Sequence, residues 1–474
     1  MEHSLNFFGN ELAEKFSKIV NTSFNDMEGL LLVRDREDPL YGYCYQALPG
    51  FGGRNSMWCR DMGTLIRELA LYGRLDSACA LSSCLIDRVG LNVDGYYTFP
   101  RFFTQVEYGK SGDELDGTGA IVIGLILLWE RLSDDCPTKK KIRDFLECKA
   151  SPIRWILSKL KDKKLIEGTG EFGSGYTIES PSCNAVQNNL VRLSLIGGAD
   201  FFAAIGEETL SDECRKASEI IEENICRYLI KDGKLVWCVD PETLEPNPEI
   251  IGAEINRGTT FINGVYVMSA DILGLGFTKE DTPLYRAGEQ TFDDLMERPL
   301  RKALFEKYGM YQQFDDFWKG FTGPAYGHGY AMQFAALTGR RDLLNRLLGY
   351  FVDYTINPDP LPNKLVRESP YWIYERYYVP EALDFGTIPE ASCGPLTIVC
   401  VTEILKVARL IAGIDHVTGE IKPTLPEGWS GFSAKGFPML KDGKTVMCDI
   451  EYRIDGDGKV SLEVKHQTSD ATSQ

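Results

Sequence analysis

Histidine is scarce in this chain of 474 residues, which has only four: His3, His328, His416 and His466. Mechanisms that depend on a histidine base, a catalytic dyad or a zinc site built from histidines are therefore disfavoured. The sequence calls for no metal ion and no organic cofactor.

A disulfide framework is also missing. The 13 cysteines are an odd number, and no two of them form a C-x-x-C pair. Cys79, Cys84 and Cys400 stand among apolar residues, which is typical of reduced thiols in a core. The first residues lack the basic and continuously apolar stretches of a signal peptide. We expect a cytoplasmic protein on these grounds.

Long apolar runs and an excess of basic residues are absent as well. The most apolar run, residues 119–129, is too short to span a bilayer. The formal net charge is -18, from 51 basic and 69 acidic residues. Because phosphate binding depends on clustered Lys and Arg, a nucleic-acid partner is excluded too. A small neutral carbohydrate fits this balance, and the oligomeric state is not predicted.

Helical patterns are what the chain does contain, up to about residue 414. The segment AIVIGLILLWERL is apolar almost all round, as a helix buried on every side should be. The segment LSDECRKASEIIEENICRYL is amphipathic, as a helix of an outer layer should be. This alternation predicts a mainly α fold with two concentric rings of helices. The expected helices are 63–72, 119–132, 139–160, 185–205, 213–230, 261–273, 284–297, 330–337, 342–354 and 396–414.

After Gly419 the sequence changes to short strand-like segments, KTVMCDIEYRI and GKVSLEVKH, with glycine-containing turns. Such a short stretch cannot form a core of its own. We therefore expect a barrel domain over residues 1–415, a small β appendage over 416–467 and a flexible tail over 468–474.

The first candidate site segment is Trp58-Cys59-Arg60-Asp61, directly before an expected helix. Asp61 is placed to be the N-cap of that helix. Arg60 and Asp61 could instead hydrogen-bond the vicinal hydroxyls of a sugar, with Trp58 against the apolar face of its ring.

An acidic cluster precedes the apolar helix that follows. Glu114 and Asp116 stand at its start, where carboxylates favour the positive end of the helix dipole. Capping needs only one carboxylate, so the surplus favours a polar cavity, with a solvated acidic loop as the alternative.

A glycine-rich segment, residues 165–179, carries three carboxylates: Glu167, Glu171 and Glu179. Each is a candidate general acid if an apolar setting raises its pKa. A flexible exposed loop is the alternative reading.

Five aromatic residues surround Glu375 in the segment 369–380, and Trp372 is one of them. A buried carboxylate must be paired or functional. Arg376 could be a purely structural partner. Residues 321–330 form another glycine- and aromatic-rich loop, in which His328 could bind sugar or cap the turn.

The order of these segments resembles the six-fold double-helical barrel glycoside hydrolases. It is most similar to glycoside hydrolase family 15, the glucoamylase family, with features of family 63 and the trehalase-like enzymes. MWCRDMGTLIRELALYGRLDSA resembles the family's W-x-R-D loop and helix, which implies that Arg60 and Asp61 bind the terminal glucose. DELDGTGAIVIGL is similar to the Q-x-D-x-x-G helix start, with Glu114 in place of Gln. The implied fold is an (α/α)6 toroid.

Three further segments extend the resemblance. LIEGTGEFGSGYT resembles the general-acid loop; because no Trp precedes Glu167, the acid stays open between Glu167 and Glu171, with Tyr176 following. GFTGPAYGHGYAMQ, which contains Tyr326, resembles a G-P-x-W segment of the trehalase-like relatives. YERYYVPEALDFGTIPEA is similar to the base loop, which implies that Glu375 is the general base.

The resemblance thus implies an inverting, exo-acting α-glucosidase of small α-glucosides. Three alternatives remain. A sugar isomerase or epimerase on the same barrel would normally need more histidines. A non-catalytic carbohydrate-binding protein would lack opposed carboxylates. A phosphorylase would need a phosphate site, for which Arg367 and Arg376 are the nearby cations.

Overall fold

The computed structural model describes residues 4–48, 55–161, 163–168, 182–236, 238–246, 282–312, 319–325, 327–357, 369–382, 384–385, 394–415, 418–441 and 444–466. Its helices are α1 (Glu11–Leu31), α2 (Cys59–Leu71), α3 (Leu75–Arg88), α4 (Leu115–Arg131), α5 (Pro137–Glu147), α6 (Pro152–Leu160), α7 (Ala185–Ala204), α8 (Glu208–Asn224), α11 (Pro283–Met296), α12 (Pro299–Tyr308), α13 (His328–Leu337), α14 (Arg341–Ile356) and α15 (Ile398–Ala412). A π-helical turn (Ile225–Leu229) extends α8, and a 3-10 turn spans Pro380–Ala382.

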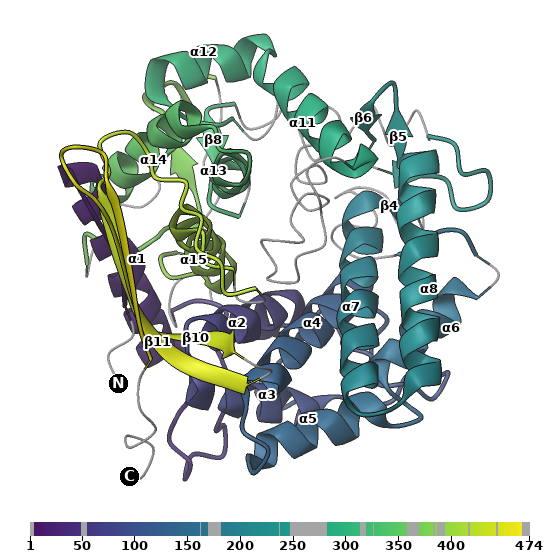
Figure 1. The fold of residues 1–474 in the computed structure, drawn as a ribbon. Coiled ribbons are helices and arrows are strands. Elements are labelled where there is room, and N and C mark those ends of the chain that lie inside the picture. Colours follow the sequence, from purple (N-terminus) through teal and green to yellow (C-terminus); the bar gives the residue numbers. More distant parts are fainter. Residues whose placement is uncertain are drawn as a thin grey trace.

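Two layers of helices surround a common axis (Figure 1). Helices α13, α15, α2, α4 and α7 pack side by side in that order and form the inner layer. Helices α14, α1, α3, α5 and α8 lie outside them, and each inner helix contacts an outer one. The described part of the chain therefore shows five inner–outer helix pairs of the predicted (α/α)6 toroid, and the expected alternation of buried and amphipathic helices is confirmed.

Glycines allow two inner helices to approach closely. A Cβ atom on Gly63 of α2 would lie 2.4 Å from the backbone carbon of Ala120 in α4. In the opposite direction, a Cβ on Gly124 would lie 2.6 Å from the carbonyl oxygen of Gly63. The α2–α4 contact is thus made by backbone against backbone, which brings the first turns of the two helices together.

Several helix boundaries differ from those expected. The helix predicted over 139–160 is two helices, because Pro152 cannot continue α5 and instead begins α6, with Ser151 as N-cap. Helices α1, α3 and α12 were not predicted. The helix expected over 261–273 lies outside the described residues.

The β appendage contains a strand from the start of the chain. Strands β1 (Ser4–Phe8), β10 (Gly431–Lys441), β11 (Lys444–Ile454) and β12 (Val460–His466) form an antiparallel sheet in the order β1-β10-β11-β12. The strands expected in the C-terminal segment are confirmed. Assigning all of residues 1–415 to the barrel was wrong for β1, because its pairing with β10 joins residues more than 400 positions apart, which no local pattern reveals.

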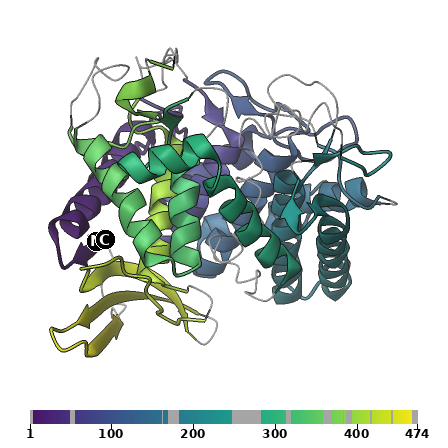
Figure 2. The same cartoon turned by 90° about the horizontal axis from the view of Figure 1, so that it is seen from above.

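The sheet packs against one end of the barrel, on the side that contains α1 (Figure 2). The ring of Tyr72, just after α2, lies 4.9 Å from that of Phe437 in β10. The Thr445 hydroxyl of β11 donates to the carbonyl of Glu130, near the end of α4, at 3.3 Å. The sheet therefore sits at the C-terminal ends of the inner helices and leaves their N-terminal ends to the loops.

Short two-stranded ribbons lie at those N-terminal ends. Strand β2 (Met57–Trp58) pairs with β3 (Phe102–Phe103) and runs into α2, and β4 (Cys183–Asn184) pairs with β7 (Cys238–Val239) and runs into α7. Strand β8 (Phe321–Thr322) pairs with β9 (Tyr377–Tyr378) shortly before α13. A further ribbon, β5 (Ile230–Lys231) with β6 (Lys234–Leu235), follows α8. No helix within the described ranges is long and apolar enough to cross a membrane.

Candidate active site

Asp61 lies in the first turn of α2 and is buried, with 2% of its surface exposed. The expectation that it caps the helix was wrong, because α2 begins at Cys59 and Trp58 occupies the N-cap position. After the ribbon β2–β3, the helix starts three residues earlier than the capping pattern suggests. Asp61 therefore directs its carboxylate sideways from the first turn, where it can contact other elements.

A network of polar side chains joins α2 to α4 and to the loop before α2. The Gln46 amide donates to the Asp61 carboxylate. The Arg60 Nε lies 3.4 Å from Asp61 Oδ1, and its Nη1 lies 3.3 Å from Asp116 Oδ2. Arg60 is thus held between two carboxylates, one from each helix start.

Asp116 is completely buried in the first turn of α4, and Glu114 occupies the N-cap position. Both lie close to Cys59 of α2. Burial raises the pKa of the Cys59 thiol well above its usual range, and the charges of Glu114, Asp61 and Asp116 add to this shift. A Cβ atom on Gly117 of α4 would lie 3.0 Å from Glu114 Oε2 and 3.4 Å from the Cβ of Cys59, so the starts of α2 and α4 are in close contact here.

The Trp58 ring packs against Phe102 of β3 and against Arg101, which directly precedes that strand. Its centroid lies 5.5 Å from that of Phe102 in a stacked arrangement, and the Arg101 guanidinium lies 4.6 Å from its centroid. Its indole N–H donates to Ser56 Oγ at 3.0 Å. Because Trp58 already stacks on protein groups while Phe102 is 36% exposed, Phe102 offers the more accessible aromatic face.

Glu375 is buried, with 3% of its surface exposed, as the aromatic segment predicted. The preceding residues are pinned to the start of α15: Ile373 accepts from the Leu396 N–H at 2.8 Å, and Tyr374 forms a β-bridge with Pro395. The nearest atoms of Arg376 and Glu375, Nε and Oε2, are 3.9 Å apart.

The same helix start connects Glu375 with the Asp61 network. The Ile398 N–H, in the first turn of α15, donates to the Gln46 carbonyl at 3.1 Å. The Thr64 and Thr402 hydroxyls, one turn deeper in α2 and α15, lie 3.4 Å apart. Residues from four distant parts of the sequence, near 46, 61, 116 and 375, therefore converge at the N-terminal ends of adjacent inner helices.

Glu167 lies at the start of a neighbouring inner helix. The preceding residue, Ile166, exchanges hydrogen bonds of 2.8 and 2.9 Å with the buried Asn188 of α7. Gly168 pairs with Ser182 in a β-bridge. The Glu167 carboxylate is exposed and lies 3.7 Å from Lys163 Nζ, so it lacks the apolar setting that the general-acid expectation assumed. The other candidate acids, Glu171 and Glu179, lie outside the described residues, as do Tyr176 and Tyr326.

Two further candidate site residues, His328 and Trp372, make contacts that stabilise the fold. Both ring nitrogens of the fully buried His328 contact backbone groups, since Nδ1 accepts from Tyr311 N–H at 3.1 Å and Nε2 donates to the Leu347 carbonyl at 2.9 Å. Burial lowers the pKa of His328 to about 4. The Trp372 indole donates to Asp26 of the outer helix α1 at 2.7 Å. The structure thus places these two side chains apart from the Asp61 network.

Sequence reasoning missed buried amides that support the site. Gln46 contacts Asp61, and Asn184, Gln187 and Asn188 lie fully buried at the start of α7. Asn184 is the N-cap of α7 and accepts from the Gln187 N–H at 2.8 Å. An Asn three residues before a Gln, directly ahead of an apolar helix, was the available signal for the α7 group.

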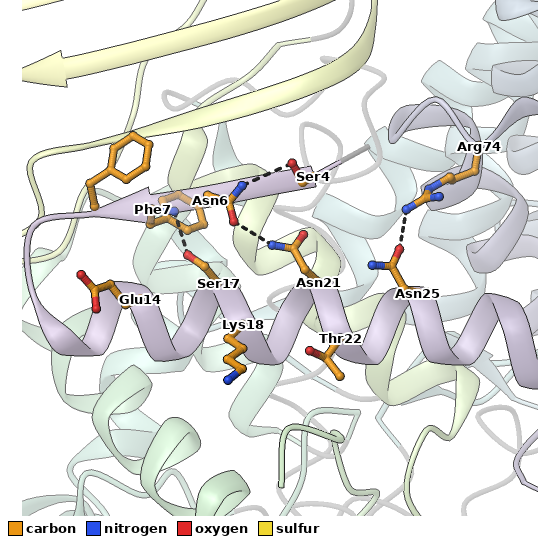
Figure 3. Close-up of a pocket in the computed structure, with 11 residues that line it drawn as sticks. Ser4, Asn6, Phe7, Glu14, Ser17, Lys18, Asn21, Thr22, Asn25 and Arg74 are labelled. Atoms are coloured by element: carbon orange, nitrogen blue, oxygen red, sulfur yellow. Dashed lines mark hydrogen bonds between the residues drawn. The ribbon is translucent and has the colours of Figure 1, made fainter. Parts of the chain in front are cut away.

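A separate groove of about 610 Å³ lies between β1 and α1 (Figure 3). There the Asn21 amide exchanges hydrogen bonds of 3.0 and 3.3 Å with the backbone of Leu5, and Arg74 donates to Asn25 at 2.6 Å. The Asn21 amide thus satisfies backbone groups on the edge of β1 that no other strand pairs with, and this protection of a strand edge is a structural role. None of the candidate site residues lines this groove.

No group of three His, Cys, Asp or Glu side chains among the described residues could hold a metal ion. The polar groups at the helix starts are carboxylates, amides and guanidinium groups, which bind hydroxyl groups well.

Known structures share this fold at low sequence identity. No family model and no curated protein matches the chain. A glycosidase solved in complex with glucose is 14% identical, covers 84% of this chain and 97% of its own, and has a TM-score of 0.56. A glucoamylase from Saccharomycopsis fibuligera is 12% identical over 86% and 98% of the two chains, with a TM-score of 0.54. A family 78 rhamnosidase from Bacillus sp. GL1 has a TM-score of 0.60 at 12% identity, over 98% of this chain and 41% of its own. The chain therefore has the double ring of helices, the (α/α) barrel, that these glycoside hydrolases share.

Proposed function

We propose that this protein is a glycoside hydrolase that acts with inversion on the terminal residue of small α-glucosides. The observation that carries the proposal is that buried Asp61 and Asp116 hold Arg60 at the starts of α2 and α4, while buried Glu375 lies beside the start of α15, the next inner helix. The similarity to glycosidases of the same barrel supports it.

In the proposed reaction, Arg60 and Asp61 hold the hydroxyls of the non-reducing sugar. Arg60 donates hydrogen bonds and Asp61 accepts them, so the pair can bind two adjacent hydroxyls at once. Since Asp116 also contacts Arg60, the guanidinium is fixed in one plane before the sugar arrives. Such fixed contacts position the scissile bond and contribute to the rate through orientation.

Glu375 is the proposed general base. It takes a proton from a water molecule that attacks the anomeric carbon from the face opposite the leaving oxygen. A second carboxylic acid, Glu167 or Glu171, protonates that oxygen as the bond breaks. Room for the attacking water requires the two carboxyl groups to lie about 6.5–9.5 Å apart. The bond is cleaved by water alone, with no organic cofactor in the scheme.

The experiment that tests this function compares two Glu→Gln variants. Replacing Glu375 should lower kcat by about 10²–10⁴ while a glucoside still binds, as measured by calorimetry. Glu381 lies six residues further on and pairs with Lys307 and Tyr308, so Glu381→Gln is the matched control and should keep kcat within about twofold. Unchanged turnover in Glu375→Gln would contradict the assignment.

A non-catalytic carbohydrate-binding protein is the second candidate, because the Arg60 clamp alone can hold a sugar. It would bind glucosides without turnover, and the Glu375 variant would bind as well as the parent.

A further inference from the structure

Gln46 lies at the junction between the Asp61 network and the segment that leads to Glu375. Its backbone N–H donates to the Ser56 carbonyl at 3.0 Å, and its own carbonyl accepts from Ile398 at 3.1 Å. The side chain is 96% buried (4% exposed). Gln46 is thus fixed on both sides, by the loop before α2 and by the first turn of α15.

The orientation of the Gln46 amide follows from its partner. The Asp61 carboxylate is an acceptor, so the NH2 group of Gln46 must face it and the carbonyl oxygen Oε1 must point the other way. In a carboxamide, both atoms are bonded to the same carbon, so Oε1 lies beside the Asp61 carboxylate.

This carbonyl oxygen has no hydrogen-bond partner among the described residues, although it is inaccessible to solvent. A buried acceptor without a donor costs stability, and native structures tolerate it where a ligand supplies the donor. A sugar held by Arg60 and Asp61 carries such donors, its hydroxyl groups, on adjacent carbon atoms.

We propose that Gln46 is a substrate-positioning residue: its Nε2 holds Asp61, and its Oε1 accepts a hydrogen bond from a hydroxyl of the bound sugar. This inference rests on the proposed function and narrows it. The site then reads two neighbouring hydroxyls, one through Asp61 and one through Gln46, and selects sugars that carry both. Deoxy sugars that lack the second hydroxyl leave Oε1 buried without a donor and are rejected.

The test is a double-mutant cycle in which one change removes the Gln46 amide and the other removes a hydroxyl group of the substrate. The kcat/KM is measured for an α-glucoside and its 2-, 3-, 4- and 6-deoxy analogues, with the parent protein and with Gln46→Met, which keeps the length of the side chain and removes both polar atoms. For the parent protein, kcat/KM should fall by about 10- to 100-fold for the analogue that lacks the hydroxyl bound by Asp61, and also for one other deoxy analogue. In Gln46→Met, that one penalty should shrink to about threefold or less, while the others persist.

Gln333→Met is the matched control. Gln333 is also a buried glutamine that donates to a carboxylate, that of Glu403, at 2.5 Å, but it lies deeper in the barrel. This variant should keep every deoxy penalty of the parent protein. Identical penalties in Gln46→Met and the parent protein would overturn the inference.

A second variant covers the case in which Gln46→Met does not fold. Gln46→Glu keeps an acceptor but places a second carboxylate beside Asp61, so the two would share a proton. Its activity should recover toward acid pH relative to the parent protein, and an unchanged pH profile would overturn the inference. If the parent protein neither binds nor cleaves any glucoside, the proposed function itself fails. If the parent protein cleaves glucosides but no deoxy penalty depends on Gln46, the proposed role of Gln46 fails and the proposed function stands.

Discussion

The deep part of the barrel and the N-terminal ends of its inner helices both bury charged residues, but they arrange them differently. Deep in the barrel, Glu68 lies 2.8 Å from Arg67 and 3.1 Å from Arg409, and Glu403 lies 2.5 Å from Lys406. We call these five residues the buried ion cluster. At the N-terminal ends, Arg60 lies 3.4 Å from Asp61 and 3.3 Å from Asp116, and the Arg376 Nε lies 3.9 Å from Glu375 Oε2.

The two regions also differ in their balance of cations and carboxylates. The buried ion cluster has three cations for two carboxylates, and its members bond closely to one another across α2 and α15. The N-terminal ends hold Asp61, Asp116 and Glu375 against Arg60 and Arg376. Close pairing compensates the loss of hydration and stabilises the barrel. The carboxylates at the N-terminal ends lie beside the loops instead of deep in the barrel, so the comparison sets a stabilising region against the proposed functional one.

The largest effect should come from breaking the buried ion cluster. Glu68→Gln leaves two fully buried arginines without their carboxylate, which should lower the free energy of unfolding by about 3–5 kcal/mol. Urea denaturation measures this loss, and the folded fraction should keep its kcat. The exposed pair of Lys140 and Asp144 provides the control, since Asp144→Asn should cost at most about 0.5 kcal/mol. A fall in kcat without a loss of stability would break the comparison.

His328 sharpens the comparison, because it lies at an N-terminal end and yet has structural contacts. Its folded-state pKa of about 4 is below the usual 6.5, so the unfolded chain binds the extra proton first as the pH falls. Stability should be full above about pH 6.5 and decrease toward pH 4, by up to roughly 3 kcal/mol. The difference in urea stability between the parent protein and His328→Gln, followed against pH, isolates this proton. A pH-independent difference would contradict the structural role.

Asp61→Asn tests the functional region directly. The charge that Arg60 and a sugar hydroxyl would contact is removed, so kcat/KM should fall by about 10- to 100-fold. The stability of the variant should change far less than that of Glu68→Gln. A loss of stability as large as that of Glu68→Gln, with kcat/KM unchanged, would show that Asp61 is a structural residue.

Phe102 gives the smallest expected effect. Its partly exposed ring, stacked on Trp58, can contact a sugar or an aromatic leaving group. Phe102→Ala should weaken binding of substrates by about three- to tenfold. Tyr108, exposed on the same loop, is the control, and Tyr108→Ala should leave KM unchanged. If Phe102→Ala and Tyr108→Ala changed KM equally, the proposed contact between Phe102 and the substrate would be wrong.

Local patterns predicted what is locally determined. Helix α4 was predicted because apolar residues surround almost its whole circumference, and the burial of Glu375 was predicted from its five aromatic neighbours. The break at Pro152 was readable but overlooked, because a continuous helical pattern outweighed one proline.

Long-range contacts were not predictable in this way. The pairing of β1 with β10 depends on residues at opposite ends of the chain. Gln46 gave no signal at all, because its partners, Asp61 and Ile398, lie 15 and 352 positions away. The roles of Glu167, Glu171 and Glu375 in catalysis stay predictions.

Proton NMR of the anomer first released from α-linked glucosides tests the central claim most directly. Inversion with Glu375 as base predicts that β-glucose appears first, and that its appearance stops in Glu375→Gln. Early release of α-glucose, or release of β-glucose at an unchanged rate by Glu375→Gln, would contradict the account.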